Sequence, residues 1–467
     1  MNTADKMALR HDTGTVAIGR EDIFAVWNNM ERAVKRVEDE NLGEAMMSLM
    51  KKLFPLPLSL TGNGVRQAFD ILSEVAVIKR REIPTGYQAF DWKVPREWNI
   101  QGASIRNSRG ETIVDLKNSN LHVLNYSIPY SGRLTLEELR PHLFTNPDQP
   151  DAIPYVTSYY REQWGFCLSQ RQLDSLPDDV YEVFIDSRLS QGSLTLADAV
   201  IPGFSDREIL FSTYICHPSQ ADDNLSGVVL TAFLCNILSP MKLRYTYRFV
   251  FVPETIGAIV YLHQEGDHLR KKLHAGYVLT CVGDPGPYTY KRSLRADTIA
   301  DRAAEHCLGH LGKDGRVNIV DFFPSGSDET QYCSPGFALP VGSLMRSRYQ
   351  KFPEYHSSLD NMNFVKPDAM ADSLRMCLRI IQALELNDTF LNRSPYCEPH
   401  LSKHKLYPTI GAGQFLPKDV ERTRYLLAYS NGERDLISIA SSANQPVWSF
   451  APQIEALVKA GLLGTAS

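Results

Sequence analysis

The chain has 467 residues, of which 43% are hydrophobic and 22% charged, and its formal net charge is −5. This length favours two or three domains, and the weakly acidic charge excludes a global basic field that would recruit nucleic acid or an anionic membrane. No apolar run is long enough to span a bilayer and no apolar segment follows the N-terminal Met, so we expect a cytoplasmic protein.

The N-terminal part of the chain begins with a polar segment and continues with helical patterns. Residues 1–18 are polar and patternless, which predicts a disordered arm. Apolar residues recur at helical spacing over 20–54, and two prolines directly after this segment end the pattern. A second helix is predicted after the segment Gly62-Asn63-Gly64. Both helices are assigned to a core that spans 19–84 and 190–395.

Residues 85–189 carry short apolar runs separated by Gly, Pro, Asn and Asp. The runs at 113–116, 121–124 and 181–185 are typical of strands in a turn-rich sheet. We therefore predict a small β-rich domain inserted into the core.

The core segment carries continuous apolar runs at 208–215, 247–252 and 276–282, which are typical of central strands. Helical patterns alternate with these runs, and they are found at 227–238, 298–311 and 368–384. This order predicts an α/β fold, with a mostly parallel sheet and helices on both faces.

The last segment, 396–467, is predicted to be a winged helix-turn-helix domain, because three short helical patterns precede a glycine and a short tail. From 418 onward it carries five basic and five acidic residues. The only charged residues of its predicted third helix are Glu455 and Lys459. Phosphate contacts need a basic surface, so no nucleic acid partner is expected. Packing or homo-oligomerisation is the predicted role.

Acids and a histidine recur just beyond the predicted central strands. His217 follows the first strand, Asp222 and Asp223 lie in the loop that opens the next helix, Glu254 follows the second strand, and Asp284 follows the third. The carboxyl ends of parallel strands meet at one edge of a sheet, so we expect these side chains to gather there. Helix capping remains the ordinary alternative for the loop acids, and a turn is an equally good interpretation of Asp284, which precedes a proline.

Two further segments carry candidate residues. Asp328 and Glu329 lie in a glycine-containing loop, and Tyr355 and His356 lie in a polar loop before the last core helix. Histidine and carboxylate side chains are the ligands that a catalytic zinc uses, and a further carboxylate can take the proton of a water molecule. The eight cysteines form no Cys-x-x-Cys pair, so reduced structural thiols are expected instead of a cysteine zinc site.

The order His, Asp, Glu, Asp, His resembles that of the co-catalytic zinc aminopeptidases and their glutaminyl cyclase relatives. The Asp-Asn-Leu-Ser-Gly segment that begins at Asp223 carries much of this resemblance. The resemblance implies that the metal ligands are His217, Asp223, Asp284 and His356. It implies that Glu254 is the general base. Candidates for contact with substrate are Asp222, Asp328, Glu329 and Tyr355.

A second likeness extends over nearly the whole chain. The chain is similar to a bacterial group of aminopeptidase-like proteins that combine a core of unknown function with a small inserted β domain and a C-terminal winged helix. The segments that carry this likeness are 59–66, 90–98, 153–155, 158–160, 164–167, 253–257 and 326–329. It implies zinc-dependent hydrolysis of an amide in an aminoacyl or peptide-like substrate, including a biosynthetic intermediate.

Three residues depart from the aminopeptidase pattern. Thr255 stands where a second glutamate would bind a second zinc, Ser219 stands where an aspartate would orient His217, and Thr280 competes with Asp284 for the third strand-end position. One zinc is therefore favoured and two remain open. A non-catalytic binding protein and a zinc-dependent acyl transferase or cyclase are the alternatives. Homo-oligomers through the β-rich or winged-helix domain are a further expectation.

Overall fold

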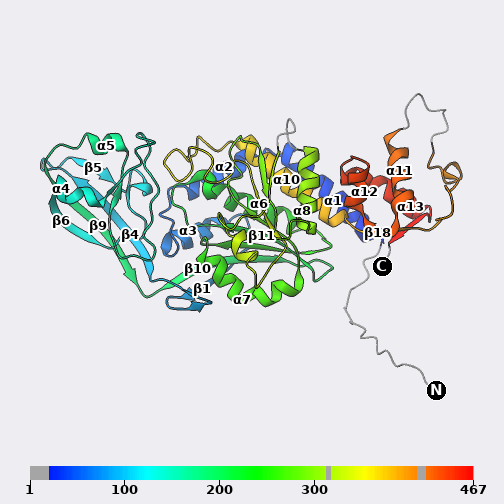
Figure 1. Cartoon of the computed structure of the whole chain (residues 1–467), viewed down its shortest axis with the longest axis horizontal. Coiled ribbons are helices and arrows are strands. Elements are labelled where there is room, and N and C mark those ends of the chain that lie inside the picture. The colour runs from blue at the N-terminus through cyan, green and yellow to red at the C-terminus, as the bar shows by residue number, and fades with distance from the viewer. Residues whose placement is uncertain (1–19, 312–316, 408–416, 466–467) are drawn as a thin grey trace, which may run out of the picture.

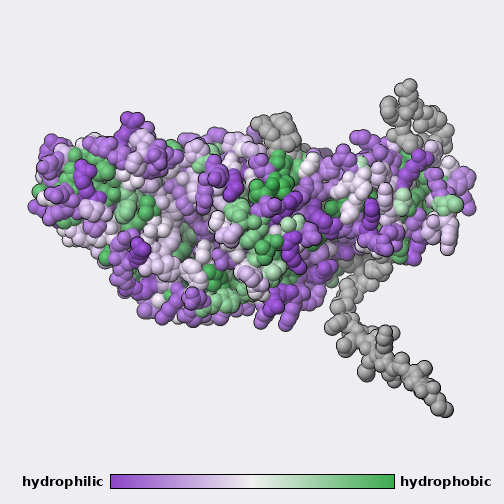
Figure 2. Space-filling view, in the orientation of Figure 1, coloured by the Kyte–Doolittle hydropathy of each residue, from purple (hydrophilic) through white to green (hydrophobic). Residues whose placement is uncertain are grey.

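A computed structural model describes residues 20–311, 317–407 and 417–465. The predicted arm, 1–18, lies outside the described residues. Figure 1 shows three units in a row: a β-rich module at one end, an α/β core in the middle and a winged-helix domain at the other end. Polar side chains dominate the face seen in Figure 2, and apolar side chains gather there in separate patches.

The core begins with three helices, α1 (Arg20–Asp39), α2 (Leu42–Leu53) and α3 (Asn63–Leu72). The single helix predicted over 20–54 is two helices, because Asn41 between them has a left-handed backbone with φ of 49°. Asparagine tolerates this conformation better than most residues, so it divides an apolar pattern that is otherwise continuous.

An eight-stranded sheet forms the centre of the core, in the order β1-β10-β12-β11-β13-β16-β14-β15. Strands β12, β11, β13 and β16 run parallel, whereas β1, β10 and β14 join the sheet by antiparallel pairing. The predicted mostly parallel sheet is confirmed. The strand bounds are β1 Lys79–Pro84, β10 Ser193–Ile201, β11 Glu208–Tyr214, β12 Thr246–Val252, β13 Leu273–Leu279, β14 Tyr288–Lys291, β15 Val317–Val320 and β16 Val341–Met345.

Helices cover both faces of this sheet. Successive strand residues point to opposite faces, so Phe211 packs with the cluster formed by α1–α3, α6, α8 and α10, while Leu210 packs with α7. The bounds are α6 Gly227–Leu238, α7 Ile256–Lys272, α8 Ile299–Leu311, α9 Glu329–Tyr332 and α10 Pro367–Leu386. Helix α7 is absent from the predicted elements, because only its first half carries a buried apolar run.

The inserted module is an antiparallel sheet with the order β5-β4-β9-β6. The predicted strand at 121–124 is wrong: Asn120–His122 form a 3-10 turn, η1, whose start is capped by the Ser119 side chain. The other elements are β2 Gln88–Ala89, β3 Trp92–Lys93, β4 Glu97–Arg106, β5 Thr112–Asp115, β6 Tyr130–Thr135, α4 Leu136–Leu139, η2 Arg140–His142, β7 Leu143–Phe144, β8 Phe166–Cys167, α5 Gln170–Asp174 and β9 Val180–Ser190.

The C-terminal unit has the elements of a winged helix. They are β17 Thr389–Asn392, η5 Leu401–His404, α11 Lys418–Tyr429, β18 Asn431–Asp435, α12 Leu436–Ser442, η6 Val447–Phe450, α13 Ala451–Lys459 and β19 Leu463–Thr465. Strand β17 pairs with both β18 and β19, so the unit begins near residue 389 instead of the predicted 396.

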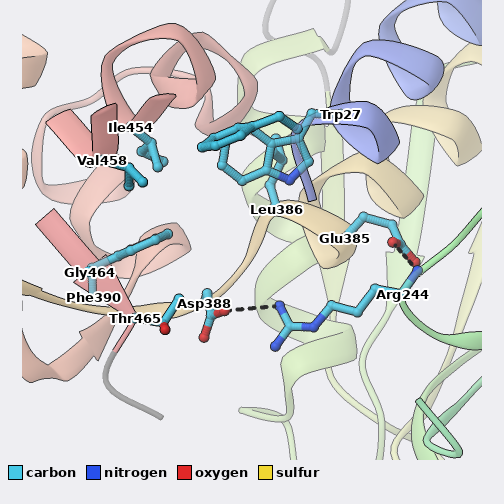
Figure 3. Close-up of a pocket in the computed structure, with 11 residues that line it drawn as sticks. Trp27, Arg244, Glu385, Leu386, Asp388, Phe390, Ile454, Val458, Gly464 and Thr465 are labelled. Atoms are coloured by element: carbon cyan, nitrogen blue, oxygen red, sulfur yellow. Dashed lines mark hydrogen bonds and ion pairs between the residues drawn. The ribbon is translucent and has the colours of Figure 1, made fainter. Parts of the chain in front are cut away.

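The winged helix packs on the core through its third helix. Trp27 of α1 faces Ile454 and Val458 of α13 across a small apolar pocket (Figure 3). Beside this pocket, Arg244 pairs with Asp388 at 3.4 Å. Among the described residues, no helix combines the length and apolarity that crossing a bilayer requires.

Candidate metal centre

Three of the predicted ligands come together at the carboxyl edge of the sheet. One donor atom from each of His217, Asp223 and His356 lies within 4.8 Å of the other two. His356 Nε2 and Asp223 Oδ2 are 2.9 Å apart, and both are buried without a hydrogen-bond partner. Two imidazoles and a carboxylate are a typical zinc donor set, so these facing, unpartnered atoms fit a bound zinc ion.

Hydrogen bonds from neighbouring residues fix the loop that carries Asp223. The backbone N–H groups of Asp222 and Asp223 donate to the Asp360 carboxylate at 2.7 and 2.9 Å. The Tyr214 hydroxyl, at the end of β11, donates to Asp223 Oδ1. The hydroxyl of Thr280, just after β13, lies 2.7 Å from the Tyr214 oxygen. Only Oδ2 of Asp223 is therefore left to face His356.

The two histidines and this hydroxyl also set the charge of the carboxylate. Burial alone would raise the pKa of Asp223, yet His217, His356 and Tyr214 hold this pKa below its ordinary value. Burial lowers the pKa of His217 to about 4. Both side chains therefore favour the protonation state that binds a metal, a carboxylate and a neutral imidazole.

His217 is oriented by a neighbour that the sequence did not indicate. Its Nδ1 lies 3.3 Å from the Cys216 sulfur, so its Nε2 faces the site, 3.6 Å from Glu254 Oε2. Ser219 does not take this orienting role, because its hydroxyl donates to the Phe54 carbonyl at 3.1 Å. Tyr214 and Cys216 are therefore the functional residues missed by sequence reasoning, and their only signal was their place at the end of the strand before His217.

Glu254 lies beside the three ligands and faces a cavity. Its side chain is 27% exposed, and its N–H donates to the Cys216 sulfur at 3.3 Å. The next residue, Thr255, has φ of 62°, and its N–H donates to Asp328 Oδ1 at 2.7 Å. Burial, then the charges of Asp328, Asp223 and Glu329, raise the pKa of Glu254 well above its ordinary value. Asp328 thus holds the turn that aims Glu254.

The structure does not bring Asp284 to this group. Its carboxylate accepts hydrogen bonds from the Gly286 N–H at 2.6 Å and from the Ser347 N–H and hydroxyl at 2.9 and 2.6 Å. The ligand assignment is therefore corrected to a turn residue, the alternative given by its proline neighbour. Thr280 occupies the strand-end position instead and bonds Tyr214.

Most of the residues predicted to contact substrate are buried and do not face the cavity. Asp222 accepts the Gly283 N–H at 2.7 Å, and Glu329 pairs with the buried Lys291 at 2.7 Å. Asp222, Asp328 and Glu329 are fully buried and line none of the cavity beside Glu254. The Tyr355 ring stacks on His356 with a centroid distance of 3.9 Å, so it fixes a ligand.

The cavity beside the three ligands lies between the core and the β-rich module and has a volume of about 260 Å³. A β-bridge between Pro154 and Ser357, and a hydrogen bond of 2.8 Å from the Tyr155 N–H to the His356 carbonyl, join the module to the ligand loop. The lining residues are Leu60, Trp92, Tyr155, Thr157, Tyr159, Tyr160, Cys216, His217, Glu254, Thr255, Ile256 and His356.

Comparisons with known proteins identify the domains. A family model described as Domain of unknown function (DUF4910) matches residues 47–387, and a winged helix-turn-helix model matches 388–465. A Clostridium acetobutylicum protein is 45% identical over 435 residues, which cover 93% of this chain and 99% of that protein. Its name proposes a role in polysaccharide biosynthesis and an aminopeptidase-like domain.

Solved structures show the fold. A C. acetobutylicum crystal structure, titled as a proposed peptidase, has a TM-score of 0.88 and 43% identity, with 93% of this chain and 100% of that chain covered. A Shewanella amazonensis M28 peptidase precursor has a TM-score of 0.55 at 13% identity, with 77% and 96% covered. A Bacillus subtilis zinc aminopeptidase has 0.52 at 11%, with 73% and 94% covered.

The last two similarities establish an aminopeptidase-like fold, which agrees with the resemblance found in the sequence. The family match and the 45% identical relative extend that agreement over the core and the winged helix. The chain belongs to the DUF4910 family, with an aminopeptidase-like core followed by a winged helix-turn-helix domain.

Proposed function

We propose that the protein is a zinc-dependent hydrolase that cleaves an amide bond of an aminoacyl or peptide-like substrate. The observation that carries this proposal is the convergence of His217, Asp223 and His356 beside Glu254, at one end of a cavity. The aminopeptidase-like fold is consistent with it.

In this proposal, three residues bind the metal and a fourth transfers a proton. His217, Asp223 and His356 would hold the zinc, which when bound polarises a substrate carbonyl and makes a water molecule acidic near neutral pH. Glu254, beside His217 Nε2, would accept a proton from the attacking water and donate it to the leaving nitrogen. The raised pKa of Glu254 suits this proton transfer, because a carboxylate of ordinary pKa is too weak a base to accept the proton readily.

We propose one zinc ion per chain. A second ion would need a free oxygen on Asp223 and further acidic ligands. Oδ1 of Asp223 is occupied by the Tyr214 hydroxyl, and Thr255 and Thr280 offer no carboxylate.

Metal content and turnover test this function together. We expect one zinc per chain by mass spectrometry of the intact protein. His217→Ala should lose the metal, whereas Glu254→Gln should retain it and lose about 10²–10⁴-fold in kcat on aminoacyl anilides. Absence of zinc after incubation with zinc salts, or equal kcat in Glu254→Gln, would contradict the proposal. Product masses that show a cyclised or transferred acyl group would favour the transferase alternative.

A further inference from the structure

The cavity beside Glu254 is lined by two unlike sets of side chains. One set is His217, His356 and Glu254, and the other is aromatic side chains of the inserted segment, of which Tyr155 lies with its ring centroid 5.1 Å from that of His217. The hydroxyls of Tyr155 and Tyr159 are 2.5 Å apart and bond each other, so both polar ends are satisfied within the wall. What these residues offer to a ligand is the apolar surface of their rings.

The aromatic wall is fixed on both sides. Residues 153–158 are tied to the ligand loop, since the Ser358 N–H donates to the Ile153 carbonyl at 2.9 Å, next to the bridge between Pro154 and Ser357. The hairpin of β2 and β3 is tied to α7 through the Tyr87 hydroxyl, which lies 2.8 Å from His263 Nδ1.

Trp92 of this hairpin and Tyr160 of the inserted segment form an aromatic pair in the cavity lining. Trp92 and Tyr160 meet edge to face, with ring centroids 5.6 Å apart, and they are 37% and 56% exposed. Such exposure of large rings on a fixed wall is typical of a binding surface for another apolar group.

The charges of the cavity exclude many ligands. Among the described residues that line it, Glu254 is the only carboxylate, and none is a lysine or arginine. A carboxylate or phosphate on the bound group would lose its hydration against the aromatic rings without gaining a lysine or arginine partner there. The volume of about 260 Å³ exceeds the roughly 150 Å³ that suffices for benzene in an apolar cavity.

We propose that this cavity selects substrates whose acyl side carries a large, uncharged, apolar group, foremost an aromatic ring, and that Trp92 and Tyr160 are the selecting residues. This inference rests on the proposed function. A bounded cavity suits the terminal residue of a substrate, and in an aminoacyl amide that residue lies on the acyl side.

The test compares amides that share one anilide leaving group. We expect kcat/KM to be at least about tenfold higher for the phenylalanyl than for the alanyl compound, and lowest for the aspartyl compound. Trp92→Ala and Tyr160→Ala should lower kcat/KM about tenfold or more for the phenylalanyl compound and change the alanyl value little. Phe184→Ala, which removes a ring 45% exposed on the same module, is the matched control and should leave all values unchanged.

Equal values for the phenylalanyl and aspartyl compounds, or equal losses on all compounds in Trp92→Ala, would overturn the inference. A binding measurement separates this failure from failure of the hydrolase proposal. In Glu254→Gln, phenylalaninamide should bind about tenfold more tightly than aspartamide by calorimetry, and Trp92→Ala should remove that preference. This outcome supports the cavity even if no amide is cleaved, and equal binding contradicts it.

Discussion

At the scale of single residues, two of the three proposed ligands contact a neutral side chain. A tyrosine hydroxyl bonds Asp223 and a cysteine sulfur lies against His217. Hydrogen bonds to metal ligands fix their orientation and tune their basicity, and their loss typically weakens metal binding 10–100-fold. Tyr214 and Cys216 are therefore expected to act through the ligands they touch.

Removal of the Tyr214 hydroxyl tests this positioning role. Tyr214→Phe should weaken zinc binding by about tenfold or more, because Asp223 loses the donor that holds its Oδ1. Competition with a chelator measures the change. Tyr181→Phe removes a hydroxyl that donates to the Pro177 carbonyl in the β-rich module, so it should leave zinc affinity unchanged. Equal affinity in wild type and Tyr214→Phe would contradict the role.

A second residue-scale prediction concerns the ion pair between Arg66 of α3 and Glu97 of β4. Arg66 Nη2 lies 2.6 Å from Glu97 Oε2, and this contact lowers the pKa of Glu97 to about 2. A carboxyl with a lowered folded pKa stabilises the fold above its unfolded pKa of about 4.3, and the contribution disappears as pH falls toward 2.

Glu97→Gln should therefore cost about 2 kcal/mol near neutral pH, seen as a lower Tm. The difference in Tm from wild type should shrink as pH falls below about 4. Glu162→Gln breaks the exposed pair with Arg96 and should change Tm little at any pH. A Tm difference for Glu97→Gln that does not vary with pH would show that the ion pair is not its cause.

At the scale of elements, the central strands were the most predictable part of the fold. The runs at 208–215 and 247–252 match β11 and β12 within one residue, because strands covered on both faces are apolar throughout. The strand proposed at 121–124 failed because Leu121, although buried, lies in a 3-10 turn that the Ser119 side chain caps. Apolar runs of four residues do not distinguish these structures.

The candidate site could be predicted where a histidine or an acidic residue comes just after a predicted central strand. His217, Asp223, Glu254 and His356 were named from the sequence, and the structure brings these four side chains close together. For Asp284, the sequence did not distinguish a metal ligand from a turn residue. The role of Tyr214 depends on which strands are neighbours, because its hydroxyl reaches Thr280, just after β13, only in the folded sheet.

At the scale of the whole molecule, the winged helix is tied to the core by polar and apolar contacts. Arg302 of α8 pairs with Asp435 at 2.6 Å, and the Val447 N–H donates to His306 Nε2 at 2.9 Å. Helix α13, which would enter a DNA groove in a typical winged helix, packs against α1. We propose that this domain is a structural cap without a nucleic acid partner.

Fluorescence anisotropy with duplex DNA tests that proposal. Because acidic and basic side chains balance from residue 418 onward, we expect Kd weaker than about 10⁻⁴ M at physiological salt and little change with ionic strength. Binding below about 10⁻⁶ M with a steep salt dependence would contradict it.

The bridge between Pro154 and Ser357 makes the inserted module and His356 mechanically inseparable. If the module rocks outward to admit substrate or release product, the strain passes through that backbone pairing to a proposed zinc ligand. Opening of the cavity and loosening of the proposed metal site would then be one movement. Exchange of modules between homologues would alter metal retention along with selectivity unless this pairing is kept.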